Sequence, residues 1–155
     1  MKTLAKLTIK FFENVCFAEI PGTACPESDR QCFIRALNQF LSSGDKGDAF
    51  TVYFCFSEIF KLFGDGYGNT QKLLELLSDH EYHSGELLSK HRDHYSHSVY
   101  VFALGLAIYA NDSAYRVNFL KFYSLLDNNS SHLRFLYLWG MAALFHDIGY
   151  PFQLA

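Results

Sequence analysis

Residues 99–110 form an uninterrupted apolar run, VYVFALGLAIYA. The run is too short to cross a bilayer as a helix, which takes roughly 18–20 residues. It is also too apolar to lie in water, so we predict a helix buried in a protein core. The charges scattered through residues 1–15 do not form a secretory signal. Together these features predict a cytoplasmic protein without a membrane span.

The rest of the chain carries the spacing of three and four that is typical of amphipathic helices. In residues 2–18 this spacing is seen at Leu4, Leu7 and Phe11, among others. The predicted helices cover residues 2–18, 28–43, 49–63, 71–80, 99–110 and 111–126, and the last helix begins near residue 131. The stretch 51–54 has high β propensity, so a strand is the alternative there. The pattern as a whole predicts an all-α helical bundle.

Several local signals mark the ends of these helices. Ser28, with Gln31 three residues later, predicts a capping box at the start of the second helix. Asp112 or Ser113 is expected to cap the helix after the apolar run, and GDKGD at 44–48 is expected to separate two helices. The face of the last helix that we expect to be buried holds Leu133, Leu136, Tyr137, Gly140, Met141 and Leu144.

Length and composition limit the classes of protein to consider. A chain of 155 residues, half of them hydrophobic, suits one domain with a sizeable core. A net charge of −3 gives no basic surface for nucleic acid. The four cysteines form no CxxC pair, so we expect buried or free thiols in a reducing compartment, with a disulfide framework as the lesser alternative.

The dipeptide His146-Asp147 stands at the end of the last apolar helix, just before Gly149. A carboxylate near a core is costly unless it is paired or bound to a cation. A neutral imidazole nitrogen and a carboxylate oxygen are both good ligands for a divalent cation. The alternative is a helix C-terminal pair, in which His146 contacts the last carbonyl groups and Gly149 ends the helix.

A second group of histidines precedes the apolar run, in HRDHYSHSVYV at residues 91–101. His97 shares a helix face with Val101 and Leu104, and we therefore expect it to point toward the core as a candidate ligand. The alternative is a core or boundary histidine with ordinary partners. Gly105 and Gly140 lack side chains, so we expect their two helices to approach closely, which would bring His97 near His146 and Asp147.

Taken together, these segments resemble the HD-domain superfamily of metal-dependent phosphohydrolases. RDHYSHSVYV supplies Arg92, His97, Ser98 and Val101 in the context of the family's early histidine, and LFHDIGYP supplies the His-Asp pair. The resemblance covers roughly residues 88–155 and makes this region a partial HD-type domain. Residues 1–87 have no counterpart, and we expect them to form a helical region packed with that domain as one unit.

The chain departs from the family pattern after Asp147, where no acidic residue or histidine follows. The late metal-binding aspartate of the family is therefore absent. We expect the chain to be the N-terminal part of a longer protein, and the alternative is a short protein with a degenerate site.

The resemblance implies hydrolysis of a small phosphorylated substrate, such as a nucleotide, with a divalent metal ion as cofactor. His97, His146 and Asp147 would hold the metal, and Asp147 would also orient the attacking water as the catalytic residue. Arg92 and, more weakly, His94 would contact the substrate, while a surface salt bridge of Arg92 to Asp93 or Glu86 is the alternative. With three ligands we expect weak metal binding and little turnover. The competing hypothesis is a non-catalytic helical interaction or regulatory module.

Overall fold

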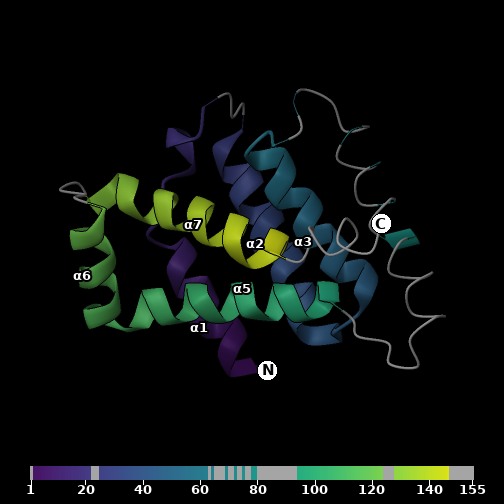
Figure 1. The fold of residues 1–155 in the computed structure, drawn as a ribbon, viewed down its shortest axis with the longest axis horizontal. Coiled ribbons are helices and arrows are strands. Elements are labelled where there is room, and N and C mark those ends of the chain that lie inside the picture. Colours follow the sequence, from purple (N-terminus) through teal and green to yellow (C-terminus); the bar gives the residue numbers. More distant parts are fainter. Residues whose placement is uncertain are drawn as a thin grey trace.

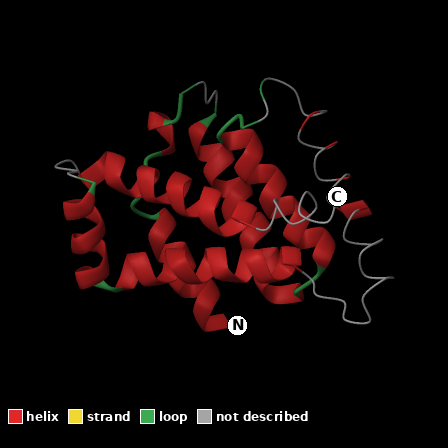
Figure 2. Cartoon of the chain, in the orientation of Figure 1, coloured by secondary structure: helices red, strands yellow, loops and turns green. Residues whose placement is uncertain are grey.

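A computed structural model describes residues 2–21, 25–62, 94–123 and 128–146, together with the isolated positions 64, 69, 72, 75, 78 and 79. These residues form six α-helices and one short 3₁₀ helix and contain no strand (Figures 1 and 2). The elements are α1 (Lys2–Phe12), η1 (Phe17–Glu19), α2 (Pro26–Ser43), α3 (Lys46–Ile59), α5 (His94–Asn111), α6 (Ser113–Phe122) and α7 (Asn128–Phe145). The all-α prediction is confirmed for this part of the chain, including the stretch 51–54, which is helical.

The ends of α2 and α3 differ from the predicted ones by a few residues. α2 begins at Pro26, two residues before Ser28, because proline at the first helical position needs no N–H partner. Gln31 consequently donates to the Glu27 carboxylate and does not cap the helix. Gly44 ends α2 with a φ of 69°, and Asp45 caps α3 by accepting from the Gly47 N–H. The predicted break at 44–48 is therefore only two residues long.

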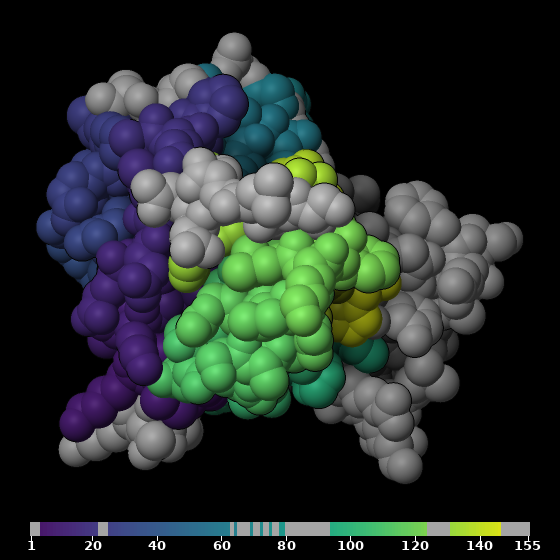
Figure 3. Space-filling model, turned by 90° about the vertical axis from the view of Figure 1, so that its left-hand side faces the viewer, coloured from purple at the N-terminus to yellow at the C-terminus, as the bar shows by residue number. Residues whose placement is uncertain are grey.

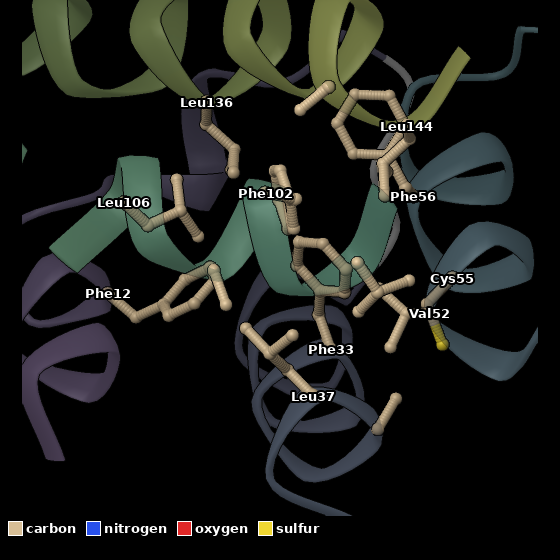
Figure 4. Close-up of a cluster of buried hydrophobic side chains, with 14 of the residues drawn as sticks. Phe12, Phe33, Leu37, Val52, Cys55, Phe56, Phe102, Leu106, Leu136 and Leu144 are labelled. Atoms are coloured by element: carbon tan, nitrogen blue, oxygen red, sulfur yellow. The ribbon is translucent and has the colours of Figure 1, made fainter. Parts of the chain in front are cut away.

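The apolar run forms the central helix of the bundle, α5, which packs against α1, α3, α6 and α7. Phe102 and Leu106 are fully buried, and Figure 4 shows both among the side chains of the core cluster. Burial is nevertheless not complete around the helix, because Leu104 is 52% exposed and Ile108 is 41% exposed. The predicted core helix is confirmed, with one strip of its surface left in solvent.

The hydrophobic core draws on both of the predicted regions. Phe12, Phe33 and Phe56 come from the region 1–87, and they share one cluster with Phe102 and Leu136 from the second region. The boundary near residue 87 lies outside the described residues, so the division into two regions stays a prediction.

α7 packs through part of the predicted face, shifted around the helix. It begins at Asn128, three residues early, and its buried side chains include Phe135 and Ala143 beside the expected Leu136 and Leu144. Tyr137 and Met141, which were expected in the core, are more than one-third exposed. The physical reason is that α7 carries apolar residues on most of its surface, so spacing alone does not select the side that docks.

At each of the two glycines, an aromatic ring from a neighbouring helix occupies the space that a side chain would take. A Cβ atom on Gly105 would lie 2.1 Å from the Trp139 ring, and one on Gly140 would lie 2.1 Å from the Phe56 ring. Gly105 therefore lets α7 approach α5 as predicted, whereas the space at Gly140 is filled from α3. Trp139 is fixed further by its Nε1–H, which donates to the Phe102 carbonyl at 3.0 Å.

Asp112 separates α5 from α6 and is the N-cap of α6. Of the two predicted cap residues, Asp112 and Ser113, it is therefore Asp112 that caps the helix. Its carboxylate accepts from the N–H groups of Ala114 and Tyr115 at 2.8 and 3.0 Å.

We expect Asp112→Ala to lower the free energy of unfolding by about 1 kcal/mol, because two N–H groups lose their acceptor. Asp112→Asn keeps the acceptor oxygen and should stay within about 0.5 kcal/mol of the parent. Urea denaturation of the three proteins measures the difference, and equal losses in both variants would contradict the capping role.

Within the described residues, none of the helices has the length and apolar character needed to cross a membrane.

Candidate functional site

The start of α5 and the end of α7 meet the same residue of α3. The Tyr53 ring lies 5.6 Å from the Tyr95 ring and 5.6 Å from the Phe145 ring, between ring centroids, and both contacts are edge-to-face. Tyr95 follows His94, and Phe145 precedes His146. The two histidine-bearing segments, about 50 residues apart in sequence, are therefore anchored at one end of the bundle.

The pairing of α5 with α7 leads to the same placement. The two helices run in opposite directions, with Leu136 near Leu106 and Leu144 displaced toward Phe56 (Figures 1 and 4). Trp139 of α7 lies at the level of Phe102 and Gly105 of α5. Seven residues further along α7, about 10.5 Å, is His146, and seven residues back along α5 is the segment 95–98. His146 therefore lies close to the level of the first turn of α5.

The α5 histidine nearer to the side covered by α7 is His94 and not the predicted His97. His97 is exposed, so the prediction that it points to the core is wrong. Its helix face continues through Leu104, which is itself exposed, because that apolar strip of α5 is left uncovered. At 100° per residue, His94 lies only about 20° around the helix from Gly105, the position that receives Trp139, whereas His97 lies about 80° away. The half-buried His94 is thus closer than His97 to the side that α7 covers.

His146 itself is exposed and is held by the end of its own helix. Its Nδ1 lies 2.9 Å from the carbonyl oxygen of Ala143. A carbonyl can only accept, so Nδ1 carries the proton and the lone pair of the neutral ring is on Nε2. A backbone carbonyl on the second ring nitrogen is the usual way in which metal-binding histidines are oriented. The same hydrogen bond also fits the alternative of a helix C-terminal histidine, so it agrees with both hypotheses.

Two further polar groups near the start of α5 bear on what this end of the bundle can bind. The Ser98 side chain is 1% exposed, and its Oγ makes no hydrogen bond within the described part of the chain. Ser98 is on the side of α5 that faces α7, about 20° from Gly105. Lys46 of α3 places its Nζ 5.4 Å from the centroid of the Tyr95 ring, which brings a positive charge to the first turn of α5. Lys46 was missed in the sequence because it lies 48 residues upstream, in a region with no recognised motif.

Asp147 and Arg92, with the alternative partners Asp93 and Glu86, lie outside the described residues. Among the residues that are described, no three His, Cys, Asp or Glu side chains are close enough to hold a metal ion. The predicted ligand set of His97, His146 and Asp147 therefore stays a prediction.

A surface groove of about 610 Å³ lies elsewhere on the molecule, between η1, the end of α3 and the first half of α7. Its lining from α7 ends at Tyr137, nine residues or about 13 Å along the helix from His146. The groove is therefore separate from the histidine-bearing end of the bundle. No protein-family model, curated protein or solved structure matches this chain.

Proposed function

We propose that this chain carries an HD-type metal site and acts in metal-dependent hydrolysis of a small phosphoester, such as a nucleotide. The cation would be held by the adjacent residues His146 and Asp147 and by a histidine from the start of α5. The observation that carries the proposal is the placement of His146 at the level of the first turn of α5, with both segments anchored on Tyr53.

Of the two α5 histidines, His94 is the better candidate for the shared cation. It is half-buried and close to the side of α5 that α7 covers, whereas His97 points into solvent. His94 would then take the role that the sequence pattern assigned to His97. Because the ring of His146 is oriented by the Ala143 carbonyl, its Nε2 can bind a cation without a change of tautomer.

The remaining groups suit a phosphorylated ligand. A divalent cation at this site would polarise a phosphoryl oxygen and lower the pKa of a bound water. Asp147 would orient that water by accepting its hydrogen bond. The positive charge of Lys46 lies at the first turn of α5, and a cationic side chain can bind phosphate oxygens. Arg92 is the further candidate for phosphate from the sequence pattern.

Calorimetric titration with Mn²⁺ tests the metal site. We expect weak, saturable binding at one site, because only three protein ligands are proposed. His146→Gln should weaken binding roughly tenfold or more, and His94→Ala should do the same. His132→Gln is the matched control, since His132 lies at the other end of α7, about 21 Å along the helix from His146.

The chemistry is tested on the same proteins with nucleoside monophosphates and p-nitrophenyl phosphate. We expect a slow, Mn²⁺-dependent release of phosphate that His146→Gln and Asp147→Asn abolish and His132→Gln retains. The proposal fails if His146→Gln binds Mn²⁺ as tightly as the parent protein. If Mn²⁺ binds as expected but no phosphoester is hydrolysed, the site is a metal site without this activity.

A second candidate, a non-catalytic helical interaction module, is favoured by the surface of α6. No residue of this helix is buried, and it forms a large part of one face of the molecule (Figure 3). Phe122 is 80% exposed, and Tyr115 and Val117 are also exposed. An aromatic surface of this kind is typical of a contact with another protein. This candidate predicts no saturable Mn²⁺ binding and identical behaviour of the parent and His146→Gln.

A further inference from the structure

Two cysteines from neighbouring helices lie side by side, and the proposed function uses neither of them. Cys32 of α2 and Cys55 of α3 have their Sγ atoms 3.7 Å apart. The two residues are separated by 23 positions in sequence, and α2 and α3 are packed against each other. A disulfide has an S–S distance of about 2.05 Å, so closing the gap takes a movement of under 2 Å.

The two thiols differ in their access to solvent. Cys32 is exposed, whereas Cys55 is 8% exposed and belongs to the core cluster (Figure 4). Burial first, and then the nearby Cys32, raise the pKa of the Cys55 thiol to about 12. A buried thiol of this kind is a poor nucleophile toward an oxidant in solution. An exposed thiol beside it is therefore the one that an oxidant reaches first.

We propose that Cys32 and Cys55 form a redox-sensitive pair that closes to an interhelical disulfide when the protein meets a peroxide. In the first step Cys32 sulfur attacks the peroxide, an S–O bond forms as the O–O bond breaks, and one water leaves with the thiol proton. In the second step Cys55 sulfur attacks the sulfenic sulfur of Cys32. The S–S bond forms, the S–O bond breaks, and the departing hydroxide takes the Cys55 proton as a second water. The two thiols lose two electrons, which reduce hydrogen peroxide to water.

Closure ties α2 to α3 and should stabilise the bundle. The cross-link restricts the unfolded chain by closing the loop between the two cysteines. We expect the melting temperature of the oxidised protein to rise by roughly 5–10 °C, and dithiothreitol should return it to the starting value. The disulfide would join the two helices that carry Phe33 and Phe56, and α3 also carries Tyr53 of the candidate site.

The test uses the full chain with Cys16→Ser and Cys25→Ser, which leaves only the proposed pair. Treated with one equivalent of hydrogen peroxide, this protein should lose two hydrogen atoms in its intact mass and remain monomeric on a non-reducing gel. Peptide mapping should recover the peptide of Cys32 joined to that of Cys55. In the same background, Cys32→Ser should leave Cys55 reduced, because the buried thiol is not reached.

Two outcomes would overturn the inference. One is oxidation of Cys32 to a sulfinic acid while Cys55 stays a reduced thiol, which is alkylated once the protein is unfolded. The other is a disulfide between two molecules in place of the internal one. Both Cys32 and Cys55 are retained in the test protein. If the double variant folds poorly, the same peptide map on the wild-type chain shows whether Cys32 and Cys55 are joined.

Discussion

Phe56→Ala should lower the free energy of unfolding by about 3–5 kcal/mol, the usual cost of removing a buried aromatic ring. The Phe56 side chain is fully buried and contacts the rings of Phe33, Phe102 and Phe145. It also fills the space over Gly140, so its loss leaves a cavity between α3, α5 and α7.

The matched control for this change is Phe122→Ala. Phe122 is the same residue type in a helix, but it is 80% exposed, and its loss should change stability by no more than about 0.5 kcal/mol. Urea denaturation of both variants measures the difference. Similar losses at the two positions would mean that the core is not centred where these helices cross.

Gly105→Ala should lower the free energy of unfolding by about 1–3 kcal/mol, although alanine is the better helix former. The new methyl carbon would overlap Trp139 ring atoms at 2.1 Å. That ring cannot turn aside easily, because its Nε1–H is bonded to the Phe102 carbonyl and its face stacks on Phe135. The backbones of α5 and α7 therefore have to separate.

A double-mutant cycle shows whether the ring is the cause. Trp139→Leu removes the indole, and in that background Gly105→Ala should cost little or become stabilising. If Gly105→Ala costs the same with and without Trp139, the contact between the two positions is wrong.

Much of the helical architecture could be predicted from sequence because local signals were strong. The apolar run at 99–110, the cap at Asp112 and the glycine break at Gly44 each act through residues within a few positions. The observed helix ends differ from the predicted ones where backbone or tertiary effects outweigh the local pattern, as at the start of α2, which is at Pro26 and not at Ser28. Helical spacing identifies residues that share a face, which is why these assignments held.

Spacing does not say which of several apolar faces a core will cover, and this is why the expected burial of His97 was wrong. Val101 and Leu104 suggested that the face of His97 is buried, but the bundle covers the neighbouring side of α5, nearer to His94. The docking side of α7 was predicted only in part for the same reason, since Tyr137 and Met141 are exposed. The pairing of Cys32 with Cys55 and the approach of Lys46 to Tyr95 depend on long-range packing, so no local pattern could reveal them.

The proximity of the two histidine segments can be measured by NMR of the histidine side chains during a Mn²⁺ titration. A bound paramagnetic ion broadens the signals of nearby nuclei. We predict that the His94 and His146 imidazole signals broaden together at the lowest Mn²⁺ concentrations, while His132 stays sharp. Broadening of His146 without His94, or equal broadening of all the histidines including His132, would contradict a shared cation at this end of the bundle.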